Sequence, residues 1–116
     1  MLLVVLAPAS LAAGAFEWLR DSATGSFTEA DWGLVRGTVE EAFANVEDGE
    51  RRDWSNPDTG SRGAVKPLLS FRHEGLQCRR LAFLNVSERG GRGVVAYTLC
   101  RGDDGALRYL PRSEHP

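Results

Sequence analysis

The sequence is poor in the residues that bind metals and carry out catalysis. Its 116 residues include two cysteines, two histidines and one methionine. His73 and His115 lack metal-ligand spacing, and the cysteines form no C-x-x-C pair. The His-Glu-Gly at residues 73–75 lacks the second histidine of a zinc-binding helix, and neither G-x-S-x-G nor a Ser-His-Asp order occurs. The sequence therefore predicts a protein that is not an enzyme and binds no metal or other cofactor.

Long apolar runs are also missing. A membrane-spanning helix needs about 20 apolar residues, and residues 1–15 (MLLVVLAPASLAAGA) form a shorter run. This run is uncharged and ends in Ala13-Gly14-Ala15, which fits the small-x-small rule for signal-peptide cleavage. We expect a signal peptide at residues 1–15, a mature chain without a transmembrane span, and export to the periplasm or the outer membrane. Because no Lys or Arg follows Met1, an upstream start or a buried first helix is the alternative.

Lysine is nearly absent, since 13 of the 14 basic residues are arginine. Residues 16–50 contain 9 acidic and 2 basic residues, which gives a net charge of −7. Residues 51–116 contain 12 basic and 7 acidic residues, which gives +5. This asymmetry indicates either attraction between two parts of one domain or an anionic partner.

Residues 28–112 are typical of one α+β domain, preceded by a flexible lead-in at 16–27 and followed by a tail at 113–116. Thr28 and Asp31 resemble a capping box at the start of an amphipathic helix that ends at Asp48-Gly49. Its apolar stripe recurs every three or four residues and comprises Trp32, Val35, Val39, Ala42, Phe43 and Val46.

After the helix, short strand-like runs alternate with tight turns, which predicts an antiparallel β-meander of four to five strands against the helix. The runs are residues 50–55, 64–72, 76–86, 94–101 and 107–110. Pro67 interrupts the second run, and because proline cannot donate to a ladder, we expect a sheet edge or a bulge there.

The stretch DWSNPDTGSRG, residues 53–63, raises the question of whether it is a binding loop or a corner of the sheet. The sequence in the middle of this stretch is typical of a structural turn, with Asn56, Pro57, Asp58 and Gly60 as the turn residues. Pro57 presets φ, Asp58 can bond its own backbone, and Gly60 accepts a positive φ. We interpret the stretch as a corner.

The two cysteines, Cys78 and Cys100, fall opposite each other if ERGG at residues 88–91 is the tip of a hairpin. Centring the hairpin between Arg89 and Gly90 gives cross-strand partners whose numbers add up to about 179, and centring it on Arg89 gives 178, the register in which the two cysteines are opposite. One face then carries Leu81, Phe83, Val95, Tyr97 and Leu99, which is a plausible core face. In an oxidising compartment we expect a Cys78–Cys100 disulfide.

Three segments resemble the C-terminal domain of the seventeen-kilodalton outer-membrane surface antigens of Gram-negative bacteria: WSNPDTGSRGAVKP, CRR and AYTLCRGDDGALRYL. The resemblance runs from about Trp54 to Leu110. It implies an envelope protein that is not an enzyme. Many members carry a lipoprotein cysteine and a glycine-rich segment before the domain, and this sequence shows neither, which leaves membrane anchoring open. The matching positions are Trp54, Asn56, Pro57, Thr59, Gly60, Gly63, Val65, Pro67, Cys78, Arg79, Tyr97, Cys100 and Gly105.

These observations favour a structural or interaction module of the cell envelope, with an unknown envelope protein as its partner. The alternative is a small periplasmic binding or inhibitor module that presents an arginine-rich sheet face to an anionic envelope component. Arginines alternate with aromatic residues on the strands, as in nucleic-acid binders, but export excludes nucleic acid as a partner. The arginines expected to contact the anionic ligand are Arg62, Arg72, Arg79 and Arg80.

Cleavage after Ala15 makes a direct prediction. N-terminal sequencing of the protein isolated from the periplasm should give Phe16 as the first residue. A cytoplasmic product that keeps Met1 would contradict both the signal peptide and the oxidising compartment that the disulfide requires.

Overall fold

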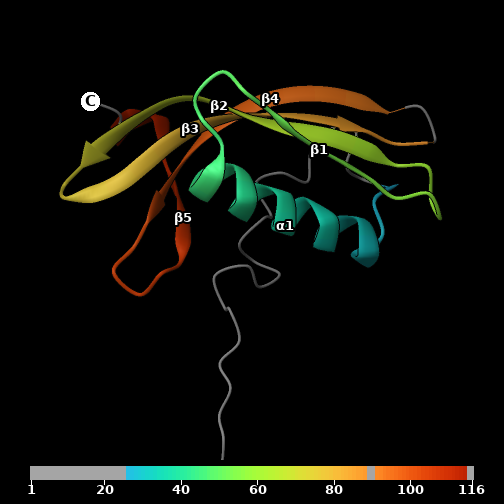
Figure 1. The fold of residues 1–116 in the computed structure, drawn as a ribbon, viewed down its shortest axis with the longest axis horizontal. Coiled ribbons are helices and arrows are strands. Elements are labelled where there is room, and N and C mark those ends of the chain that lie inside the picture. Colours follow the sequence, from blue (N-terminus) through green and yellow to red (C-terminus); the bar gives the residue numbers. More distant parts are fainter. Residues whose placement is uncertain (1–25, 89–90, 115–116) are drawn as a thin grey trace, which may run out of the picture.

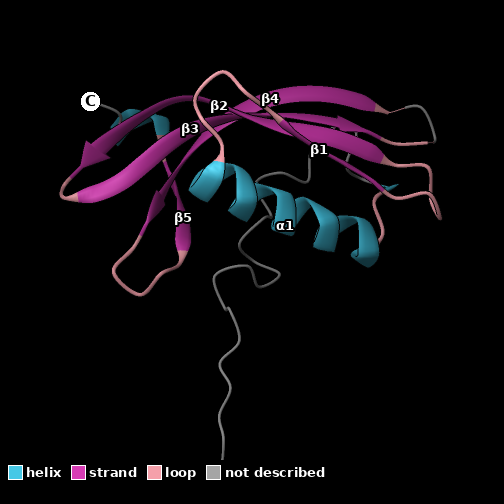
Figure 2. Ribbon diagram, in the orientation of Figure 1, coloured by secondary structure: helices cyan, strands magenta, loops and turns pink. Residues whose placement is uncertain are grey.

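The structure, a computed structural model, describes residues 26–88 and 91–114. Helix α1 (Glu29–Asn45) is followed by one five-stranded antiparallel sheet of spatial order β1-β2-β3-β4-β5 and a 3₁₀ turn, η4 (Arg112–Glu114) (Figures 1 and 2). The strands are β1 (Arg52–Ser55), β2 (Arg62–His73), β3 (Leu76–Val86), β4 (Arg92–Arg101) and β5 (Leu107–Leu110). The predicted α+β meander is confirmed, with strand ends within two residues of those expected. The predicted signal peptide lies outside the described residues.

The helix begins and packs as its sequence predicts. The Asp31 N–H donates to Thr28 Oγ1 at 3.1 Å, and the Thr28 N–H donates to Asp31 Oδ2 at 2.9 Å, which completes the capping box. All six residues of the predicted apolar stripe are buried. Helix α1 lies against one face of the sheet, as Figure 1 shows, and its stripe belongs to the core cluster between them.

The sheet contributes apolar side chains to the same core, among them Val65, Leu81, Phe83 and Leu99, all almost fully buried. Phe27, which the sequence assigns to the lead-in, also joins this core. Its ring packs edge-on against Trp32 at 5.5 Å and against Trp54 at 5.3 Å between ring centroids. The edge-on geometry is one that aromatic pairs favour.

Trp54 also explains one glycine of the sheet. Gly63 is its direct cross-strand partner, and a Cβ atom at Gly63 would lie 2.7 Å from Trp54 Nε1 and closer still to the carbonyl oxygen of Leu84. No side chain fits there, so the indole covers bare backbone. A larger residue at 63 would displace the tryptophan.

The stretch at 53–63 is a corner, and it is bonded to the helix. Asn56 accepts at its carbonyl from the Gly60 N–H, and Gly60 has φ 78°, in the left-handed region that favours glycine. Asn56 Nδ2 then donates to Asp31 Oδ1 at 2.8 Å, and Thr59 Oγ1 donates to the same oxygen at 2.7 Å. The turn therefore fixes the first turn of α1 on the sheet.

Asp31 is fully buried, and burial alone raises the pKa of a carboxyl group. The hydrogen bonds from the Thr28 N–H, Thr59 and Asn56 outweigh burial and hold the pKa of Asp31 below its ordinary value. Asp31 is therefore ionised in the folded protein at neutral pH.

Arg79 holds the other end of the helix. It lies buried on the helix-facing side of β3. Its Nη1 donates to the carbonyl oxygens of Ala42 at 3.0 Å and Phe43 at 2.8 Å, at the C-terminal end of α1. Nη2 pairs with Asp48 at 2.8 Å, and Nε donates to Ser70 Oγ at 2.8 Å. A cation at the helix C-terminus satisfies carbonyls that the helix leaves free and matches its dipole.

Ion pairs join the acidic first part of the chain to the basic second part. They are Arg52–Glu41, Arg79–Asp48 and Arg101–Glu40, at 3.1, 2.8 and 3.1 Å. The guanidinium of Arg101 also lies over the ring of Phe43, 5.0 Å from its centroid. The interpretation that the charge asymmetry acts within one domain is confirmed for these pairs.

Pro67 lies at both an edge and a bulge. The pairing of β1 with β2 reaches only as far as Val65, so Pro67 lies beyond β1 on the outer edge. The register with β3 shifts between Pro67 and Leu69, which leaves Leu68 as the extra residue of a bulge. The Pro67 carbonyl accepts from the Gly49 N–H at 2.8 Å.

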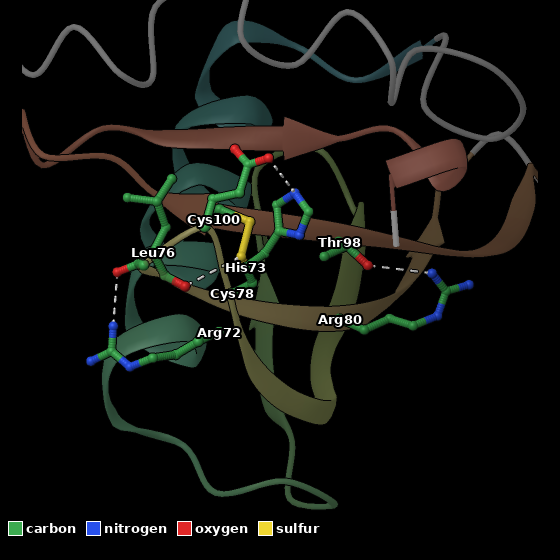
Figure 3. The surroundings of a disulfide bond; sticks show 9 residues. Arg72, His73, Leu76, Cys78, Arg80, Thr98 and Cys100 are labelled. Atoms are coloured by element: carbon green, nitrogen blue, oxygen red, sulfur yellow. Dashed lines mark hydrogen bonds and ion pairs between the residues drawn. A yellow bond between two sulfur atoms is a disulfide. The ribbon is translucent and has the colours of Figure 1, made fainter. Parts of the chain in front are cut away.

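The hairpin of β3 and β4 has the predicted register. Cys78 pairs with Cys100, and the two are joined by a disulfide 22 residues apart in sequence (Figure 3). The predicted core face of this hairpin faces the helix, whereas the disulfide lies on the opposite face. There it forms a small second cluster with Leu110, against which Phe71 and Leu76 pack.

We expect Asp31→Asn to destabilise the fold at pH 7 by about 1–3 kcal/mol, because an amide presents an N–H where the carboxylate accepts. Since the folded pKa is lowered, the stability from ionised Asp31 is complete above the unfolded pKa and is lost as pH falls through the folded value. Urea unfolding at pH 7 and pH 3 should show the gap between variant and wild type shrinking in acid. Asp58→Asn, at an exposed site in the same loop, is the matched control; an equal loss in both variants would contradict the role of Asp31.

The disulfide should raise the free energy of unfolding by about 3 kcal/mol, from the loop-closure entropy for its 22-residue separation. Reduction should therefore lower the melting temperature by about ten degrees or more. A non-reducing peptide map should give a single Cys78–Cys100 link. The double variant Cys78→Ala, Cys100→Ala should melt at the same temperature with and without reductant, and two reactive thiols in native protein would contradict the assignment.

Candidate functional site

One face of the sheet packs on α1, and the opposite face carries no described helix or strand over most of its length (Figure 1). We name this surface the open face and define it by the rows of side chains that the strand register aligns across β2, β3, β4 and β5. The rows are Arg62–Val86–Arg92, Ala64–Leu84–Val94, Lys66–Ala82–Ala96, Leu69–Arg80–Thr98–Leu110 and Phe71–Cys78–Cys100–Arg108.

The two ends of the open face differ in burial. At the disulfide end, Cys78, Cys100 and Thr98 are buried. Toward the other end an apolar strip of Ala64, Leu84, Val86 and Val94 reaches solvent at Val94, which keeps 68% of its surface exposed; on the β2 side Leu69, in the same row as Thr98, keeps 46%. An apolar strip that reaches solvent at this level is a feature of interaction surfaces when polar residues surround it.

Basic residues surround this strip, and the one acidic residue that the strand register adds to these rows is Asp53 of β1, opposite Ala64. The basic residues are Arg62, Lys66, Arg80, Arg92 and Arg108. Arg108 is paired with Asp104 at 2.5 Å, and Arg80 Nη1 lies 3.5 Å from Thr98 Oγ1. The remaining cations leave the open face positively charged.

A groove of about 410 Å³ lies at the bare end. The apolar side chains Ala64, Leu84 and Val86 line it, with Arg62 on one side and Arg92 on the other. These two arginines occupy one row with Val86 between them, so their backbones are two strand spacings apart, about 10 Å. Two guanidinium groups at this separation suit an anionic group bound between them, since their N–H forks match carboxylate and phosphate oxygens.

Arg51 and Asp53 also line the groove, and they are paired with each other. The Nε of Arg51 lies 3.0 Å from Asp53 Oδ1, and both side chains are well exposed. An exposed pair of this kind is weak, so Arg51 can exchange Asp53 for another anion.

The structure divides the four arginines that the sequence proposes as ligand contacts. Arg62 and Arg80 lie on the open face. Arg72 lies on the other face, and its Nη1 donates to the Gly75 carbonyl at 2.9 Å. Arg79 is engaged in the bonds at the helix end described above and only 9% of its side chain is exposed, so its contact with a ligand stays a prediction that the burial does not favour.

Three basic residues of the open face, Lys66, Arg92 and Arg108, are not among the four arginines expected from the sequence. Arg92 lies just after the predicted hairpin tip, and the index sum of 178 places it opposite Val86. Lys66 is on this face because of the β2–β3 register, which the bulge at Leu68 makes invisible to a simple count.

The described residues contain no group of three or more His, Cys, Asp or Glu that could hold a metal ion. No helix in residues 26–88 and 91–114 is long and apolar enough to cross a membrane. His73 has only Glu74 beside its Nε2, at 3.7 Å, and no nucleophile is in hydrogen-bond contact with it. What the open face offers chemically is charge and apolar contact.

Comparison of the chain with family models, with curated proteins and with solved structures finds no match in any of the three. The resemblance to the surface antigens stays a prediction from the residues.

Proposed function

We propose that this protein is an exported, non-catalytic interaction domain of the cell envelope that binds an anionic envelope component through its open face. The observation that carries this proposal is the excess of arginine and lysine around the exposed apolar strip, where Asp53 is the one acidic residue in the rows and is paired with Arg51. A purely structural role in the envelope does not call for such a face.

The disulfide supports the compartment in this proposal. Cys78 and Cys100 form the one pair in the chain. Structural disulfides persist in oxidising surroundings such as the periplasm and are rare in the cytosol.

Binding should depend on salt. Exposed ion pairs contribute at most about 1 kcal/mol each, so an anionic partner must engage several of these cations at once, and their summed attraction is screened as ionic strength rises. The apolar strip adds contact that salt does not screen. An anionic partner with apolar parts, such as an acidic lipid or glycolipid surface, would contact both the cations and the apolar strip of the open face.

Charge reversal at the groove tests the proposal. The double variant Arg62→Glu, Arg92→Glu should lower affinity for vesicles of an anionic phospholipid by at least about tenfold, because each reversed charge replaces an attraction of up to about 1 kcal/mol with a repulsion. Cosedimentation should also weaken between about 0.05 and 0.5 M salt, as the Debye length shortens.

Zwitterionic vesicles and a soluble anionic polysaccharide distinguish a lipid from a glycan as the source of the charge. Arg36→Glu, on the helix and away from the open face, is the matched control. Equal binding by the double variant and the wild type, or an equal loss in the Arg36 variant, would refute the role of the open face.

A further inference from the structure

The outer edge of β4 is only half covered by its neighbour. β5 pairs with β4 from Thr98 to Arg101, and within residues 26–88 and 91–114 no strand pairs with Arg92–Tyr97 on that side. Figure 1 shows β4 continuing past the end of β5. An unpaired edge presents backbone N–H and C=O groups to which another strand can add.

The hydrogen bonds that extend the β3–β4 and β4–β5 pairings show which backbone groups of β4 point to the open edge. The Ser87 N–H donates to the Gly91 carbonyl at 2.8 Å, which continues the β3–β4 register. Odd-numbered residues of β4 therefore bond to β3, because bonding alternates along an antiparallel strand.

The other side of β4 follows the complementary rule. The Gly102 N–H donates to the Ala106 carbonyl at 2.8 Å, which continues the β4–β5 register with an even-numbered residue. In the uncovered half of β4, the residues whose backbone groups point to the open edge are then Arg92, Val94 and Ala96.

The fold protects its other long edge but not this one. The outer edge of β2 carries Pro67 and the bulge at Leu68, and the turn before β1 bonds to it through Gly49 and Asp48. Proline, bulges and covering loops are the devices that keep an edge from pairing. Within residues 26–88 and 91–114, the uncovered half of β4 has no proline and no bulge, and Arg112 lines a pocket with Ala96 only at the end next to β5. Its central side chain, Val94, is the most exposed large apolar side chain among the described residues.

We propose that β4 pairs with the same strand of a second copy of this chain, antiparallel and centred on Val94. The reason is symmetry: the three outward-pointing residues are centred on Val94, so the free stretch is its own complement. Val94 then faces Val94 of the second copy, and Arg92 faces Ala96 twice. These three pairs exchange about six backbone hydrogen bonds.

The side chains agree with this register. Two valines meet, which is a favourable cross-strand pair, and no like charges lie directly opposite each other. The two-fold axis is perpendicular to the sheet, so both helices lie on one side and both open faces lie on the other. A ten-stranded sheet results, with a single apolar strip running across the junction. This inference does not depend on the proposed ligand, because the association is measured without one.

Sedimentation velocity of the oxidised protein, from about 1 μM to 1 mM, tests the pairing over the range of weak to moderate Kd. The wild type should form dimers as concentration rises. Val94→Lys should raise the dimer Kd at least tenfold, because it places two like charges opposite each other while keeping the backbone N–H. Val94→Pro should also abolish the dimer, since it removes an outward-pointing donor and leaves the β3–β4 ladder bonded.

Val94→Thr is the control and should dimerise like the wild type, because threonine keeps the β-branched shape and the backbone donor. Circular dichroism and the disulfide map report whether each variant is folded. If Val94→Pro does not fold, the test rests on Val94→Lys. A wild type that is monomeric throughout this range, or a dimer that persists in Val94→Lys, would overturn the proposal.

Discussion

The attachment of a single helix to a single sheet is the constraint on which this structure depends. An apolar stripe alone would let the helix slide or rotate on the sheet, since hydrophobic contact has no direction. Two buried polar groups remove that freedom. Asp31 binds the corner at Asn56 and Thr59 to the helix start, and Arg79 binds β3 to the helix end. Losing the groups that bond to Asp31 or Arg79 would leave a buried charge without its hydrogen bonds, which is costly.

This attachment gives a physical meaning to the residues that suggested a family. Asn56 and Thr59 donate to Asp31, Gly63 makes room for Trp54, and Arg79 holds the helix carbonyls. Each of these positions serves the fold, although Trp54 and Gly63 also line the groove. The matching positions therefore have structural roles, and neither of the two groove arginines, Arg62 and Arg92, is among them.

The structural features that could be predicted from the sequence are those that depend on local patterns. The helix stripe follows from its period, and the β3–β4 register follows from two cysteines and one turn. Prediction from the sequence failed where one residue changes a count or where partners are far apart. The bulge at Leu68 shifts the β2 register and moves Arg72 to the helix side, and no pattern links Arg79 to carbonyls 36 and 37 residues earlier. Whether a charged residue is buried against partners so far away in the sequence depends on tertiary packing, which no local pattern indicates.

The meander has a consequence for how the chain reaches this state. Every pair of neighbouring strands is also consecutive in sequence, so the sheet has low contact order, and each hairpin can close before the next forms. With Cys78 and Cys100 as the one pair of cysteines in this chain, oxidation has a single product and needs no reshuffling. The slowest steps left are the thiol oxidation itself and the docking of the helix, which closes the longest loops. An intermediate with a formed hairpin and an undocked helix would expose the core face, and it is the state that a chaperone would recognise.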